Sequence, residues 1–218
     1  DKHQQILDNF GFDEDISIWE EEFFEALEFI KTLQIVNGEY FINNAIASGN
    51  KILAEGAQGS MLDVDFGTFP YVTSSSTITA GVCSGLGIAP QKIKEVIGIT
   101  KAYGTRVGSG PFPTELHDDT GEQIRQSGNE FGSTTGRPRR CGWIDLVALN
   151  FACMINGVTQ LVMTKADVLD DLEILKVANG YNDDGRETKL IPFQMERVKL
   201  VPVYKEFNGW NENITQVK

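Results

Sequence analysis

The segment from Glu95 to Met163 constrains the fold most, because it alternates strand-like apolar runs with one long apolar helix. The pattern predicts a strand over Glu95–Lys101, a buried helix over Trp143–Asn156 ended by a glycine, and a further strand over Gln160–Met163. Strands that alternate with helices indicate an α/β fold with a mainly parallel sheet and flanking helices. No repeat or linker interrupts the chain, so we expect a single domain over residues 1–218.

The segment before this one predicts two helices and a strand. Ser17 and Glu20 have the spacing of a capping box, and apolar side chains then recur at helical spacing to about Leu33. The residues of this stripe, which we expect in the core, are Trp19, Phe23, Leu27, Ile30 and Leu33. A second helix is predicted over Tyr40–Ala47. Lys51–Ala54 is predicted as a short buried strand that enters a glycine turn, an arrangement typical of α/β sites.

The pattern loosens after Asp170. The polar stretch Asn179–Lys189, rich in Gly, Asn, Asp and charged residues, predicts a surface excursion. Val198–Tyr204 predicts a strand at the edge of the sheet, because an edge position tolerates Pro202.

Composition excludes several classes of protein. With 218 residues, a net charge of -12 and no apolar run near the length of a membrane helix, the chain is predicted to be soluble, without membrane or nucleic-acid partners. Three cysteines without a CxxC pair favour reduced thiols and a cytoplasmic location. The chain begins at Asp1 without a signal peptide, which indicates an excised piece of a longer protein.

The loop Gly132–Arg140 is the strongest candidate site. Its glycines leave backbone N–H groups accessible, its hydroxyls add donors, and its guanidinium groups match carboxylate or phosphate with two hydrogen bonds each. The loop therefore predicts a site for a small anion. A solvated basic turn or a nucleic-acid patch is the alternative, and the acidic composition disfavours the latter.

Thr164-Lys165-Ala166-Asp167 follows an apolar strand and fits a guanine-reading motif. An Asp carboxylate there accepts hydrogen bonds from both N1–H and the 2-amino group of guanine, neither of which adenine offers in that geometry. A helix cap formed by Asp167 is a comparable explanation.

Glu55-Gly56-Ala57-Gln58-Gly59-Ser60 and the polar run from Tyr71 to Thr77 form a third group. The Gln58 amide can face a base edge, and the hydroxyls from Thr73 onward suit phosphate. Ordinary turn and cap chemistry explains the same residues. Asp63 and Asp65 are two residues apart and are more often structural than metal ligands.

The glycine and proline loop Gly104–Glu115 predicts a fixed wall beside a site, and its glycines do not fit the dinucleotide pattern. The sequence also lacks GxxxxGK[ST], HExxH and GxSxG, and its two histidines are His3 and His117. We therefore expect no histidine-based catalyst within this chain.

Four long motifs, read in order, resemble adenylosuccinate synthetase from Leu53 to Asp170: EGAQGSMLDVDFGTFPYVTSS, ITKAYGTRVGSGPFPTEL, GSTTGRPRRCGWID and TKADVLD. The resemblance implies an adenylosuccinate-synthetase-like fold related to that of P-loop NTPases. It implies a ligase of AMP biosynthesis, in which GTP with Mg²⁺ phosphorylates the 6-oxygen of IMP and L-aspartate displaces that phosphate to give adenylosuccinate. It also implies a cytoplasmic homodimer.

The resemblance further implies roles for individual residues. Gln58 and Thr73 would contact IMP, Lys165, Ala166 and Asp167 would bind the guanine of GTP, and the arginine loop would bind aspartate. Arg137 would also lie near IMP, and Arg139 near GTP. The loop residues concerned are Ser133, Thr134, Thr135, Gly136, Arg137, Pro138 and Arg139.

This sequence departs from the family at two points. Ala166 stands where the family usually has Leu. The chain also contains no GDEGKGK segment, which in the family holds the general-base aspartate and a magnesium ligand, nor the family's catalytic histidine or its C-terminal end. We therefore expect recognition surfaces without catalytic residues, Mg²⁺ ligands or turnover. A non-catalytic nucleotide-binding or interaction module is the alternative, whereas a guanine-nucleotide switch fails for lack of a phosphate loop.

Overall fold

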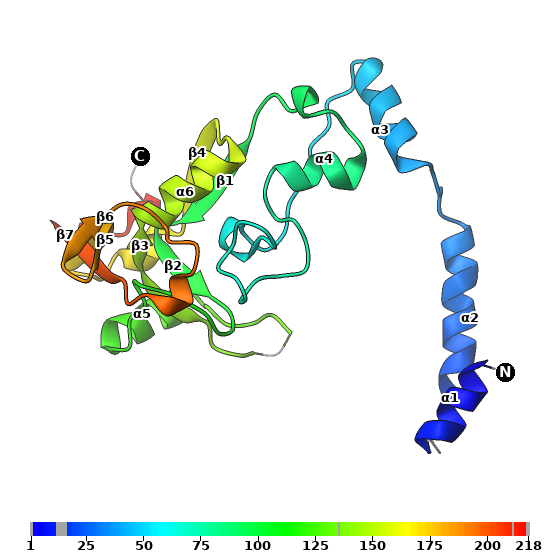
Figure 1. The fold of residues 1–218 in the computed structure, drawn as a ribbon, viewed down its shortest axis with the longest axis horizontal. Coiled ribbons are helices and arrows are strands. Elements are labelled where there is room, and N and C mark those ends of the chain that lie inside the picture. The colour runs from blue at the N-terminus through cyan, green and yellow to red at the C-terminus, as the bar shows by residue number, and fades with distance from the viewer. Residues whose placement is uncertain (1, 12–16, 135, 211, 217–218) are drawn as a thin grey trace.

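The computed structural model describes residues 2–11, 17–134, 136–210 and 212–216 (Figure 1). The α-helices are α1 (Lys2–Phe10), α2 (Ser17–Lys31), α3 (Gly38–Ala47), α4 (Ala80–Leu86), α5 (Asp119–Ser127) and α6 (Leu146–Asn156). The strands are β1 (Ile97–Lys101), β2 (Tyr103–Arg106), β3 (Arg140–Asp145), β4 (Gln160–Thr164), β5 (Ile174–Asp183), β6 (Arg186–Thr188) and β7 (Val201–Asn208). Short 3-10 turns lie at Ser60–Leu62, Pro90–Lys92, Ala166–Leu169 (η3), Met195–Arg197 and Ile214–Gln216.

The α/β class is confirmed, with both parallel and antiparallel pairs. β1 pairs with β4 in parallel, Ile97 opposite Gln160, and β3 pairs with β5 in parallel. The pairs β2–β3, β5–β6 and β5–β7 are antiparallel, and these partners were not predicted. Strands β1 and β4 lie where the sequence placed them, and β7 overlaps the predicted strand Val198–Tyr204. Pro202 lies on β7, which among the described strands pairs only with β5 and is therefore at an edge.

The segment Trp143–Asn156 is not one helix. Trp143 lies in β3, and Asp145 ends that strand by accepting hydrogen bonds from the N–H groups of Val147 and Ala148, at 3.0 and 3.1 Å. This cap starts α6 at Leu146, and the helix is mostly half-buried rather than buried. It ends as predicted at Gly157, whose positive φ of 63° suits glycine.

One further prediction was wrong. Lys51–Ala54 is not a strand, and the Leu53 side chain is 90% exposed, because none of the described strands lies beside it to pair with. The polar stretch Asn179–Lys189 is largely exposed, and it has regular structure: it forms the end of β5, a turn with positive φ at Asp184 and Gly185, and β6. Turn residues that tolerate positive φ favour such a hairpin even in a polar segment.

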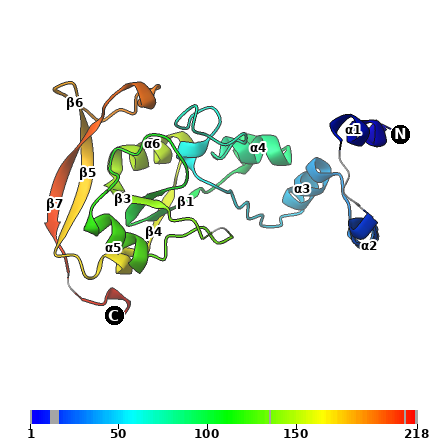
Figure 2. The ribbon, with the colours of Figure 1, turned by 90° about the horizontal axis from the view of Figure 1, so that it is seen from below.

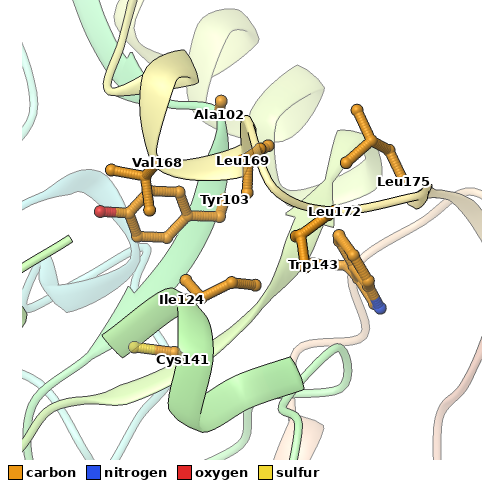
Figure 3. Close-up of a cluster of buried hydrophobic side chains, with 9 residues drawn as sticks. All are labelled: Ala102, Tyr103, Ile124, Cys141, Trp143, Val168, Leu169, Leu172 and Leu175. Carbon is orange, nitrogen blue, oxygen red and sulfur yellow. The ribbon is translucent and has the colours of Figure 1, made fainter. Parts of the chain in front are cut away.

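The core lies where α5, β2 and β3 meet the turn η3 and the start of β5 (Figure 3). Its members are Ala102, Tyr103, Ile124, Cys141, Trp143, Val168, Leu169, Leu172 and Leu175. A side chain at Gly142 would meet the backbone of Thr114 at 2.2 Å, so glycine lets the loop 107–115 cross β3 closely. Cys83, Cys141 and Cys153 carry free thiols.

The first helices stand away from the sheets (Figures 1 and 2). Helices α2 and α3 formed as predicted, but the core placement of the α2 stripe was wrong, since Trp19, Phe23 and Leu33 are each more than half exposed and Ile30 is 45% exposed. Spacing along the chain determines that the helix forms, whereas burial needs a neighbouring element, and none of the described elements covers this stripe. None of the described helices has both the length and the apolarity needed to cross a bilayer.

Candidate functional site

The loop 132–139 closes on itself as a small hairpin. Phe131 and Pro138 form a β-bridge, the N–H of Gly132 donates to the Arg137 carbonyl at 2.9 Å, and the N–H of Gly136 donates to the Gly132 carbonyl at 2.8 Å. Gly136 has a φ of 63°, which glycine adopts without strain. Ser133, Thr134, Gly136, Arg137 and Pro138 are exposed, while Thr135 lies outside the described residues.

The three arginines of this segment differ in their surroundings. Arg137 lies in the exposed loop, and the half-buried Arg139 donates from Nη1 to Glu130 Oε2 at 2.7 Å. Arg140 belongs to β3 instead, where it pairs with both oxygens of Glu115 and donates to the carbonyls of Gly108 and Gly110. Arg140, which the sequence placed within the anion-binding segment, therefore holds the 107–115 loop in place.

The predicted guanine motif lies directly after β4. Lys165 takes a left-handed conformation with a φ of 57°, and its Nζ donates to the Gly128 carbonyl at 2.5 Å. Ala166 packs against the core, and Asp167 is exposed. Asp167 lines a cavity of about 250 Å³ whose other lining residues are Ser127, Val168, Asp170, Asp171, Glu212 and Asn213. Four carboxylates make this cavity suited to a ligand edge rich in N–H donors.

Glu130 connects the arginine loop to the guanine motif, and sequence reasoning missed it. Its side chain is 0% exposed, with Arg139 on Oε2 and with Lys101, Tyr103 and Lys165 on Oε1. Burial alone raises the pKa of Glu130, but the hydrogen bonds from Lys101, Tyr103 and Arg139 outweigh it and lower the pKa to about 2. Glu130 therefore stays ionised at neutral pH.

Gln58 and Thr73 are brought together in a second group. Gln58 has a positive φ of 63°, and its Nε2 donates to Thr73 Oγ1 at 3.5 Å, while its Oε1 accepts from Ser75 at 3.5 Å. Within the described residues, the hydrogen bonds of Gln58 and Thr73 run to their own segment and not to the 132–139 loop.

Asp63 organises this second group. Its carboxylate is 0% exposed and accepts five hydrogen bonds, from the backbone N–H groups of Asp65, Phe66, Thr77 and Ile78 and from the Ser76 hydroxyl. Burial opposes ionisation, but the backbone hydrogen bonds prevail and lower its pKa. The carboxylate thus ties the turn after Gln58 to the run that contains Thr73, which is a structural role.

We expect Asp63→Asn to lower the free energy of unfolding by about 2 kcal/mol, because the new amide would face the N–H groups of Thr77 and Ile78. A carboxylate with a lowered pKa contributes stability above its unfolded pKa, near 3.9, and loses it as the pH falls. The difference between the two proteins should therefore shrink in acid. Urea unfolding at pH 7 and at pH 3 measures both effects.

Asp65→Asn is the matched control, because Asp65 is an exposed neighbour of the same type. Its free energy of unfolding should stay within about 0.5 kcal/mol of the parent value. Equal losses in the two variants would contradict the structural role of Asp63.

The candidate metal ligands from the sequence, Asp63 and Asp65, do not form a cluster. Among the described residues, no group of three His, Cys, Asp or Glu side chains is arranged to hold a metal ion. Both oxygens of Asp63, which is buried, accept hydrogen bonds from the protein itself.

Known proteins resemble this chain along its whole length. The sequence model of the adenylosuccinate synthetase family matches residues 1–218. Adenylosuccinate synthetases from Cytophaga hutchinsonii and Phocaeicola vulgatus are 57% and 53% identical to this chain over 99% of its length. The chain covers 50% and 51% of those two proteins, so it spans about half the length of the curated relatives it matches.

A solved structure agrees with the sequence relatives. The structure of fully ligated adenylosuccinate synthetase from Plasmodium falciparum superposes with a TM-score of 0.88 and 38% identity, over 99% of this chain and 52% of that one. The family match over the whole chain and the shared fold lead to one conclusion. The chain belongs to the adenylosuccinate synthetase family.

Proposed function

We propose that this chain carries the IMP, L-aspartate and guanine recognition elements of an enzyme that joins IMP to L-aspartate at the expense of GTP, forming adenylosuccinate. The observation that carries the proposal is the meeting of two elements at Glu130: Arg139 of the anion loop and Lys165 of the guanine motif contact the same carboxylate. An enzyme that couples an amino acid to a nucleotide needs such elements side by side.

The guanine would bind at Asp167. Its exposed carboxylate can accept from N1–H and the 2-amino group, and the acidic cavity beside it favours donors over acceptors. Lys165 is tied back to the Gly128 carbonyl, which leaves its aliphatic stem as a wall for a planar base. Ala166 packs against the hydrophobic core and so anchors the motif to it.

L-Aspartate would bind in the 132–139 loop, through Ser133, Thr134, Thr135, Gly136, Pro138 and the two arginines. Arg137 would bind an aspartate carboxylate with two parallel hydrogen bonds and reach toward IMP, and Arg139 would also contact aspartate while lying near GTP. Gln58 and Thr73 would contact IMP. Their mutual hydrogen bond of 3.5 Å is long, so exchanging it for a ligand bond costs little.

Mg²⁺, a homodimeric assembly and a cytoplasmic location belong to this proposal through the family likeness alone. In such an enzyme Mg²⁺ would neutralise charge on the transferred phosphate. The residues described here would bind and orient substrates, and the general base that acts at the 6-position of IMP would come from the GDEGKGK segment, which is not among these 218 residues.

We therefore expect the 218-residue chain by itself to form no adenylosuccinate from IMP, GTP, Mg²⁺ and L-aspartate. Chromatographic separation of the products measures this, and calorimetric titration with IMP and with GTP reports whether the recognition elements still bind. Adenylosuccinate formed by the purified 218-residue chain would refute this expectation.

The proposed function itself is tested on the protein encoded by the full reading frame that contains these residues. It should form adenylosuccinate with GTP, and far more slowly with ATP, since adenine lacks the donors that Asp167 reads. Nucleotide binding without product would favour the non-catalytic module instead.

A further inference from the structure

The buried carboxylate of Glu130 is shared by two elements to which the proposed function gives separate ligands. Its Oε2 accepts from Arg139 Nη1 at 2.7 Å, and its Oε1 lies 3.4 Å from Lys165 Nζ. The backbone of Glu130 also takes part, because its carbonyl accepts from the N–H of Arg139 at 2.9 Å. The Glu130 carboxylate thus contacts both Arg139, the last residue of the 132–139 loop, and Lys165 of the guanine motif.

The remaining contacts of Glu130 hold the carboxylate itself in place. Lys101 at the end of β1 and the Tyr103 hydroxyl in β2 each lie 2.6 Å from Oε1. Tyr103 is a core residue, and a side chain at Gly128 would come within 2.4 Å of its hydroxyl. The carboxylate is therefore locked by the sheet and the core, so it cannot follow either functional side chain if that side chain moves.

The charges around Glu130 explain why its negative charge matters. Three cations, Lys101, Arg139 and Lys165, surround one fully buried carboxylate. Without that charge the three cations would repel one another at close range in a setting that water screens poorly. Arg139 and Lys165 have 32% and 41% of their side chains exposed, against 27% for Lys101, so they have the most room to swing away.

We propose that Glu130 is a positioning residue that orients Arg139 and Lys165 together and so couples the anion loop to the guanine motif. This inference rests on the proposed function, because the two cations are taken to face substrates. Glu130 touches no substrate itself. It acts through the two side chains that it holds.

The test compares Glu130→Gln with the parent in the protein encoded by the full reading frame. Both KM values, for GTP and for L-aspartate, should rise roughly tenfold or more, with a smaller change in kcat, because misplaced binding groups weaken both sites at once. Calorimetric titration with GDP should show a similar loss of affinity. Glu130→Asp keeps the charge and should recover part of both KM values.

Asp145→Asn is the matched control. Asp145 also accepts two backbone hydrogen bonds and one from a buried tyrosine hydroxyl, Tyr181 at 2.5 Å, but it caps α6. This variant should unfold at lower temperature with both KM values unchanged. Unchanged KM values in Glu130→Gln, or a rise in one KM alone, would overturn the inference.

A second variant and a binding measurement test the inference where Glu130→Gln or the assay of turnover cannot. If Glu130→Gln does not fold, Tyr103→Phe removes one hydrogen bond that locks the carboxylate and should still raise both KM values; unchanged values would overturn the inference. If the parent protein forms no adenylosuccinate, the proposed function fails. Calorimetric titrations with GDP and with L-aspartate then test the role of Glu130, because they need no turnover: both affinities should fall in Glu130→Gln, and a loss of only one would overturn the inference.

Discussion

Asp167→Asn in the full-reading-frame protein should lower kcat/KM for GTP by more than about a hundredfold and make xanthosine triphosphate the better substrate. In the proposed function the Asp167 carboxylate would accept two donors of guanine, and hydrogen bonds to a charged group contribute about 1.5 to 3 kcal/mol each. The new amide would instead meet the 2-amino group of guanine with a donor of its own. Xanthine carries an oxygen at that position, which an amide N–H can reach.

Initial rates with GTP and with xanthosine triphosphate measure this exchange. Glu173→Gln is a suitable control, because Glu173 is an exposed acid a few residues further on that does not line the cavity. It removes the same charge and should leave the preference for GTP in place. An Asp167→Asn protein that still prefers GTP would show that guanine is read elsewhere.

Local chemistry made the two proposed recognition elements visible in the sequence. The glycines and hydroxyls of the loop 132–139 and the spacing of Lys165 and Asp167 need only a few neighbouring residues to be recognised. The same holds for helices α2 and α3 and for the strands β1 and β4, whose patterns are periodic over short windows. In each case the information lies within one segment.

Contacts between distant segments escaped the sequence analysis. Glu130 stands between Asn129 and Phe131 and looks like an ordinary surface glutamate until β1, β2 and the two functional segments close around it. A glutamate placed directly before a glycine and arginine loop was the one signal that could have suggested it. Arg140 was misread for the same reason, because its partner Glu115 is 25 residues away.

The predicted boundary between strand and helix was wrong where the hydrogen bonds of one side chain outweigh the apolar pattern. Trp143 reads as part of an apolar helix, yet Asp145 caps α6 after it and leaves Trp143 in a strand beside Tyr103. The stripe of α2 failed differently, since its amphipathic pattern is real but the described elements leave Phe23 and Phe24 more than half exposed. An apolar helix face predicts that another element covers it, but the pattern does not identify that element.

Arg137→Ala should lower kcat/KM for L-aspartate by a factor that corresponds to about 2 to 5 kcal/mol of lost binding free energy. This is the usual result of leaving a charged group without its partner when a ligand is bound. Arg137→Lys should recover only part of the loss, because an ammonium group cannot form the parallel pair of hydrogen bonds that a guanidinium offers a carboxylate.

Rates measured against aspartate concentration at saturating IMP and GTP give the effect of both Arg137 variants. Arg186→Ala, in the exposed strand β6, is the control, since it removes the same charge far along the chain and should leave the aspartate KM unchanged. Arg137 lies in the exposed loop, whereas Arg139 contacts Glu130, so substitutions at the two arginines should change different KM values. Loss of Arg137 should affect aspartate with little change in the KM for GTP, and an unchanged aspartate KM would remove the main support for aspartate binding in this loop.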